Sequence, residues 1–163
     1  MRRLFRKRSK KAGLPPGSSV YTGERKMEQV QIQIIDYDQD TFQEREVPDA
    51  ETCYPFKEKD TVTWINVNGL HDVSIIEKLG SHFGLHPLVI EDILSTGQRP
   101  KMEDYDHYIY LVVRMLSYDE KAKQAEFEQV SMVLGEGFVL SFQERAGDVF
   151  DPGHDRIRTG KRR

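Results

Sequence analysis

Apolar and polar residues alternate in the first part of the chain that has a clear pattern. In EQVQIQIIDYD, residues 28–38, branched aliphatic residues alternate with glutamines. This two-residue period predicts a half-buried strand, and the more polar TFQEREV, residues 41–47, is expected to pair with it at a sheet edge. VTWINV, residues 62–67, is apolar on both faces and therefore predicts a central strand.

The period then changes to that of a helix. In HDVSIIEKLGSHFG, residues 71–84, the apolar side chains recur on one helical face. Asp72 or Ser74 can cap its first turn, and Gly84 suits the left-handed position that ends a helix. HPLVIEDIL, residues 86–94, predicts a second helix directly afterwards.

The stretch after the second helix contains residues that end helices. Pro87 suits the first turn of that helix, whereas Gly97 and Pro100 stop it. Arg99 and Lys101 are expected near its C-terminal end, where the helix dipole favours cations.

The C-terminal part of the chain reads as strands and then a helix. DHYIYLVVRMLSY is a long apolar run typical of a central strand, and AEFEQVSMVLG and FVLSFQE flank GEG, a hairpin turn. ETCYPFKEKD, residues 51–60, reads as a loop. A helix is expected from PGHDRIRTGKRR, with Asp148 and Asp151 as capping candidates. The pattern predicts an α+β fold with a mixed sheet of about six to seven strands flanked by helices, an αβα sandwich.

Charge divides the chain into three regions. Residues 1–11 hold seven basic residues, residues 156–163 hold five, and neither end contains an acid. The other 12 basic residues face all 27 acids between positions 12 and 155, a net charge of −15. Such a body repels nucleic-acid phosphate and attracts cations, so no nucleic-acid partner is expected. The basic N-terminal tail leaves contact with anionic lipid or nucleic acid open as an alternative to a solvated arm.

Composition also suggests how the chain is divided. We expect residues 1–26 to be a disordered basic tail and linker, residues 27–152 to form the α/β domain, and residues 153–163 to begin a longer helix. No run of about 20 apolar residues could span a bilayer. Cys53 is the single cysteine, so an intrachain disulfide is impossible.

Familiar catalytic motifs are absent from the sequence. There is no Gly-rich phosphate loop, HExxH, GxSxG or zinc-type cysteine pair, and we expect no enzyme activity. The five histidines, at positions 71, 82, 86, 107 and 154, are isolated from one another and more typical of structural or solvated residues than of ligands.

Acidic residues are the remaining candidates for a metal site. Glu91 and Asp92 are adjacent on the second predicted helix and therefore point about 100° apart. They cannot both hold one small ion, so a site would need a further ligand from another segment or subunit. From the residues alone, exposed acids or helix-capping partners are the simpler explanation of both. Glu103, Asp104 and Asp106 add hard oxygen ligands of the kind that Mg²⁺ prefers, although a charged loop that solvates the end of a strand is the better explanation of them.

Several motifs together resemble one known family. VTWINVNGLHD, HFGLHPLVIEDILSTGQRPKMEDYD, EQVSMVLGEGFVLSFQERAGDVFDP and RIRTGK occur in an order and spacing similar to the N-terminal cytosolic domain of the CorA family of magnesium transporters. The resemblance implies a regulatory domain of a homopentamer at the cytoplasmic face of the cell membrane. It further implies that a stalk helix, two membrane helices and a Gly-Met-Asn signature follow such a domain.

The resemblance also assigns roles. Divalent cations bound between neighbouring cytosolic domains favour the closed state of the family's pore, and Asp92 and Glu91 match its acidic pair at that interface. Mg²⁺ is then both the regulatory ligand and the transported ion, with cobalt as a further transported ion. The partner ligands are expected beyond residue 163, and the isolated chain is expected to be monomeric or weakly associated.

Two other functions remain open from the sequence. A zinc-transporting member of the same superfamily would share most of these motifs. A metal-dependent phosphotransferase or hydrolase would instead need convergent acids within one chain. The adjacent positions of Glu91 and Asp92 argue against that enzyme.

Overall fold

The computed structural model describes residues 13–120, 123–147 and 150–160. The strands are β1 (Gln31–Tyr37), β2 (Phe42–Val47), β3 (Val62–Asn68), β4 (Lys101–Tyr105), β5 (Tyr108–Asp119), β6 (Gln124–Gly135) and β7 (Phe138–Gln143). The helices are the 3-10 helix η2 (Glu51–Glu58) and the α-helices α1 (Val73–Phe83), α2 (Pro87–Leu94) and α3 (Asp151–Arg158). This order matches the predicted α+β class.

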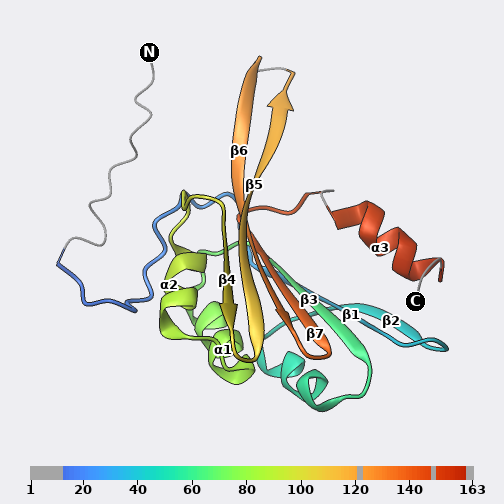
Figure 1. The fold of residues 1–163 in the computed structure, drawn as a ribbon. Helices are drawn as coiled ribbons and strands as arrows, with labels where there is room; N and C mark the ends of the chain where they lie inside the picture. The colour runs from blue at the N-terminus through green and yellow to red at the C-terminus, as the bar shows by residue number, and fades with distance from the viewer. Residues whose placement is uncertain (1–12, 121–122, 148–149, 161–163) are drawn as a thin grey trace.

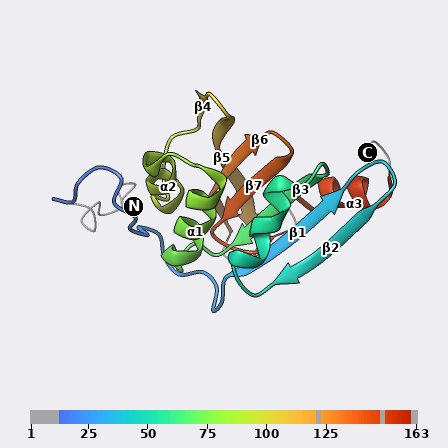
Figure 2. The same ribbon diagram turned by 90° about the horizontal axis from the view of Figure 1, so that it is seen from below.

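All seven strands form one mixed sheet, shown in Figures 1 and 2, in the order β2-β1-β3-β7-β6-β5-β4. Every neighbouring pair is antiparallel except β3 and β7, which run parallel with Thr63 opposite Phe138. The predicted sheet of six to seven strands is thereby confirmed.

Helices cover both faces of the sheet. Ile65 of β3 is fully buried in a core that includes Ile76 and Leu79 of α1. The next residue towards the N-terminus, Trp64, points to the opposite face, because side chains alternate along a strand. There its ring contacts Phe150 and His154 at the start of α3. Figure 2 shows α1, α2 and η2 on one side of the sheet and α3 on the other.

The ends of α1 follow the predicted capping pattern. Asp72 is the N-cap and accepts a hydrogen bond from the backbone N–H of Ser74 at 3.1 Å. Gly84 has φ 76° and ends the helix in the left-handed conformation. Gly97, after α2, has φ 100°. Both glycines occupy backbone conformations that a side chain would disfavour, which explains their places in the sequence.

Two segments differ from the elements expected. KMEDY, expected as part of a charged loop, is the edge strand β4, which pairs with β5; its residues alternate between half-buried and exposed positions. ETCYPFKE, expected as a loop, is the 3-10 helix η2, which buries Cys53 and Phe56 against the core. Charge in the first segment and Pro55 in the second masked the regular structure.

The two longest strands, β5 and β6, extend beyond the rest of the sheet (Figure 1). β4 pairs with β5 only as far as Val112, and β7 pairs with β6 only from Val130 onward. The remaining residues form a two-stranded ribbon. On one face of it Leu116 lies opposite Phe127, and both side chains are exposed.

Part of residues 13–26, expected to be linker, contacts α2 in the described structure. The backbone N–H of Thr22 donates to the carbonyl oxygen of Leu94 at 3.1 Å, and Tyr21 packs against the core. Residues 1–12 lie outside the described residues.

Helix α3 begins at Asp151, two residues before the expected boundary. Arg158 forms an ion pair with Glu44 of β2, which ties the helix to the sheet edge. Phe150 is the N-cap and makes no side-chain capping bond, while Asp148 lies outside the described residues. Across the described ranges, no helix is both long and apolar enough to cross a membrane.

Candidate metal site

The acidic pair lies on the half-exposed face of α2. His86 caps the helix by accepting a hydrogen bond from the backbone N–H of Leu88, and Pro87 occupies the first turn as predicted. The apolar residues Val89, Ile90, Ile93 and Leu94 are buried. Helical geometry therefore turns Glu91 and Asp92 away from the core.

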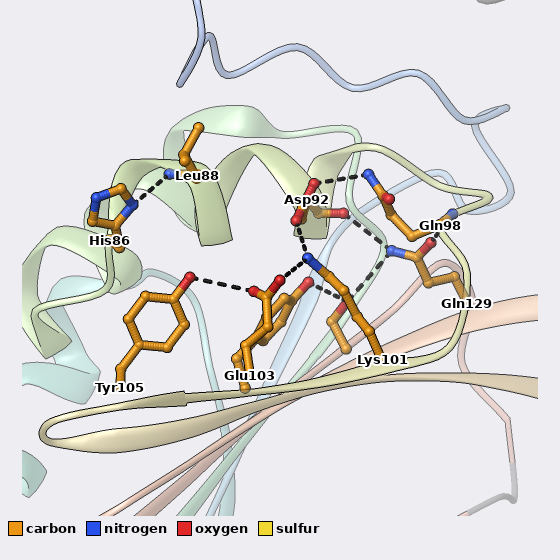
Figure 3. Close-up of polar contacts among 10 residues, drawn as sticks. His86, Leu88, Asp92, Gln98, Lys101, Glu103, Tyr105 and Gln129 are labelled. Carbon is orange, nitrogen blue, oxygen red and sulfur yellow. Dashed lines mark hydrogen bonds and ion pairs between the residues drawn. The ribbon is translucent and has the colours of Figure 1, made fainter.

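The carboxylate of Asp92 accepts hydrogen bonds from two side chains of the same chain. Its Oδ1 accepts a hydrogen bond from Gln98 Nε2 at 2.8 Å, and its Oδ2 accepts one from Lys101 Nζ at 2.6 Å. The same Nζ donates to Glu103 Oε1 at 2.7 Å. Figure 3 shows the ammonium of Lys101 between the two carboxylates. Asp92 of α2 and Glu103 of β4 thus share one cation.

The side chain of Gln129 in β6 makes hydrogen bonds to the backbone at the C-terminal end of α2. Its Nε2 donates to the carbonyl oxygen of Asp92 at 3.1 Å, and its Oε1 accepts from the backbone N–H groups of Gly97 and Gln98 at 2.9 and 2.8 Å. The Gln129 side chain is almost fully buried. The carbonyl oxygen of Asp92 also accepts from the backbone N–H of Ser95 at 3.2 Å, so Gln129 adds a second bond there and gives the N–H groups of Gly97 and Gln98 an acceptor. These bonds hold Asp92 in place.

Glu91 points to a different part of the chain. Its Oε2 accepts a hydrogen bond from the backbone N–H of Gly17 at 2.6 Å. The two adjacent carboxylates therefore contact different segments, in agreement with the angle expected from helical geometry. They do not converge on one point in this structure.

Of the three downstream acids, one joins Asp92. Glu103 shares Lys101 with it and accepts a hydrogen bond from the Tyr105 hydroxyl at 3.3 Å. Asp104 is exposed, because the next residue along a strand faces the other way, and Asp106 lies in the exposed turn after β4. The strand period separates side chains that the sequence grouped together.

Lys101 is the cationic partner that the sequence analysis placed at the helix end. Partial burial alone would lower the pKa of its ammonium, but hydrogen bonds to Asp92 and Glu103 outweigh burial and raise that pKa above its ordinary value. Lys101 therefore carries its full charge at neutral pH.

The other candidate residues lie apart from this site. His82 stacks on Tyr54, His86 caps α2, and His154 is buried against Trp64. His71 is half-buried and His107 is exposed. Cys53 is fully buried, which raises the pKa of its thiol to about 12. Among the described residues, no group of three or more His, Cys, Asp and Glu side chains could hold a metal ion.

Sequence reasoning named Asp92, Glu91 and Glu103 as candidates but missed the contacts that Gln98 and Gln129 make with Asp92. The sequence did contain a signal for Gln98, because the short GQRPK segment joins α2 directly to the next strand and so must lie near the end of α2. Gln129 had no local signal, because it is 37 residues away from Asp92 in the sequence.

Known proteins resemble this chain in both sequence and fold. A family model described as CorA-like Mg2+ transporter protein matches residues 59–163. The cobalt/magnesium transport protein CorA of Thermotoga maritima is 45% identical over 150 residues, which are 92% of this chain and 42% of that protein. The chain thus spans less than half the length of this relative.

Solved structures agree on the fold. The full-length CmaX protein matches with a TM-score of 0.64 and 14% identity, over 85% of this chain and 42% of that one. The soluble domain of CorA from Methanocaldococcus jannaschii matches with a TM-score of 0.53 and 12% identity, over 77% and 46% of the two chains.

The names of the sequence relatives describe transport of magnesium and cobalt and no enzymatic reaction. Together with the motifs of α2 and its neighbouring strands, the family match over residues 59–163 leads to one conclusion: the chain belongs to the family of CorA-like Mg2+ transporter proteins.

Proposed function

We propose that this chain forms the cytosolic regulatory domain of a membrane transporter of magnesium and cobalt. The observation that carries the proposal is its 45% identity, over 92% of its length, to a cobalt/magnesium transport protein. In this proposal the domain senses intracellular Mg²⁺ and favours the closed state of a homopentameric pore formed by other segments of the transporter.

Asp92 and Glu91 are the proposed regulatory ligands, at the interface between neighbouring copies. Support comes from their half-exposed positions on α2 and from their divergence within the chain. Partner ligands would come from a neighbouring subunit. The carboxylate oxygens fit Mg²⁺, which keeps several of its waters and takes one or two carboxylates.

The physical mechanism is a shift between two populations. A cation that binds between subunits only in the closed ring stabilises that ring in proportion to its differential affinity. A hydrated site with few direct ligands binds weakly, which suits the sensing of an abundant ion.

The test uses a chimera in which this chain replaces the matching region of the Thermotoga maritima relative. Asp92→Asn keeps the shape of the side chain and removes its charge. The internal Mg²⁺ concentration that stops uptake should then rise about tenfold, equivalent to roughly 1.4 kcal/mol of lost binding. Uptake by proteoliposomes preloaded with graded Mg²⁺ measures it.

Asp104→Asn is the matched control, because Asp104 is an exposed acid on the other face of β4. It should leave the Mg²⁺ dependence unchanged. If Asp92→Asn also leaves it unchanged, Asp92 is only an anchor for Lys101 and Gln98, and the proposed regulatory role is wrong.

A further inference from the structure

Lys101 places a fixed positive charge at the carboxylate that the proposed function assigns to a divalent cation. Its Nζ lies 2.6 Å from Asp92 Oδ2 and 2.7 Å from Glu103 Oε1. The three side chains retain between 22% and 39% of their exposure, so solvent and ions can reach them. An ammonium between two carboxylates takes the place of a small cation.

We infer that Lys101 is a built-in competitor of the divalent cation at Asp92, and that it sets how weakly the site binds. The inference rests on the proposed function and adds a residue to its regulation. A divalent cation that approaches Asp92 directly has to displace the ammonium from Oδ2 or bind with that charge close by.

The sheet holds Lys101 in position for this role. Lys101 and Glu103 are two residues apart on β4, so both side chains stand on the face of the strand that looks towards α2. Tyr110 of the neighbouring strand β5 supports the ammonium, which lies 5.5 Å from the centre of its ring. Lys101 therefore has three contacts that keep it beside Asp92.

Charge decides the direction of the effect. With Lys101 present, the cluster of Asp92, Glu103 and Lys101 has a net charge of −1, and without the ammonium that net charge becomes −2. Two carboxylates from α2 and β4 would then face one space with no internal counter-ion. Removing a positive charge a few ångströms from a bound dication should strengthen its binding by about tenfold or more.

The experiment compares Lys101→Met with the unaltered chain. Methionine keeps an unbranched apolar stem, one atom shorter, and removes the charge. Mg²⁺ is titrated at constant ionic strength, and the backbone amide NMR signals of residues 91–103 report binding near Asp92. Lys101→Met should lower the apparent Kd for Mg²⁺ about tenfold, and adding Asp92→Asn should abolish this gain.

Lys78→Met is the matched control. Lys78 also forms an ion pair with a single carboxylate, that of Glu51, at 2.6 Å, and its loss changes the net charge of the chain by the same amount. This variant should leave the Mg²⁺ titration at residues 91–103 unchanged. A second variant, Lys101→Arg, keeps the charge and should keep the weak binding.

Lys101→Gln repeats the test should the methionine variant not fold, as judged by its amide spectrum. An unchanged or weaker Mg²⁺ affinity in the uncharged variants overturns the inference, as does equal tightening in Lys101→Arg. The Asp92→Asn chimera judges the proposed function separately. If that chimera loses its Mg²⁺ response while Lys101→Met binds no tighter, Asp92 is regulatory and Lys101 has only a structural role.

Discussion

Asp36 is a buried acid in β1, 5% exposed, that three side chains surround. Its carboxylate accepts hydrogen bonds from Lys59 at 2.7 Å, Thr61 at 2.5 Å and Thr63 at 2.8 Å. Burial alone would raise the pKa of Asp36, but these bonds outweigh burial and lower it. At the scale of single residues, this carboxylate joins the start of β3 to β1.

Asp36→Asn should lower the free energy of unfolding at pH 7 by about 1–3 kcal/mol, because Lys59 loses its anionic partner. Since the folded-state pKa lies below the ordinary value of 3.8, the stabilisation is complete above that value and is lost as the pH falls through the folded-state pKa. Urea denaturation at pH 7 and pH 3 measures this. Asp40→Asn, in the β1–β2 turn, is the control, and an equal effect of both variants contradicts the prediction.

Single residues were predictable from sequence where their partners are local. Asp72 and Gly84 flank α1 and act within one helical turn, so the sequence pattern sufficed for both. Asp92 was identified as a candidate, but its link to Gln129 depends on how β6 packs beneath α2. No local pattern encodes that packing.

At the scale of elements, helix α3 packs on the sheet partly through the side chain of His154. His154 is buried, and its ring packs 4.5 Å from that of Trp64. Burial lowers the pKa of His154, and the positive charge of Arg158 lowers it further. The negative charges of Glu44, Asp151 and Asp155 raise this pKa but do not outweigh burial. The docked helix therefore favours the neutral imidazole.

Lowering the pH below about 6.5 should weaken the docking of α3, because the undocked histidine binds a proton that the docked one resists. Trp64 is the single tryptophan of the chain, so its fluorescence reports this contact directly. The signal should change between pH 7 and pH 5, and His154→Gln should remove the change. His107→Gln, in an exposed turn, should retain it; loss of the change in this control contradicts the prediction.

Elements with a strong apolar pattern were predictable, and polar ones were not. The first helix and the central strands follow from the spacing of their buried residues. Strand β4 was not predicted, because three of its five residues are charged and only its pairing with β5 makes it a strand. Its regular structure depends on a neighbour, which a local pattern does not contain.

At the scale of the whole molecule, charge governs how copies of this chain meet. The span from 12 to 155 carries a net charge of −15, and the basic residues at both ends offset most of it. Like-charged bodies repel each other when few ions are present to screen them. We therefore expect the acidic spans of neighbouring copies to repel each other and the isolated chain to associate only weakly, although its overall net charge is −3.

Sedimentation velocity in low salt without Mg²⁺ should show a monomer of 19.0 kDa at micromolar concentration. Raising the salt concentration should permit weak association, because the Debye length shortens. A stable pentamer in low salt without divalent cations would contradict this expectation.

Strands that pair in the sheet mostly come from the same half of the sequence. Every ladder lies within residues 31–68 or within residues 101–143, except the parallel pairing of β3 with β7. Thr63 and Phe138, the first pair of that ladder, are 75 positions apart. The two halves are otherwise built from antiparallel neighbours, and the chain between them carries α1 and α2. The pairing of β3 with β7 in the middle of the sheet therefore requires the longest loop closure of any strand pair. It is the strand pairing that costs the most chain entropy during folding.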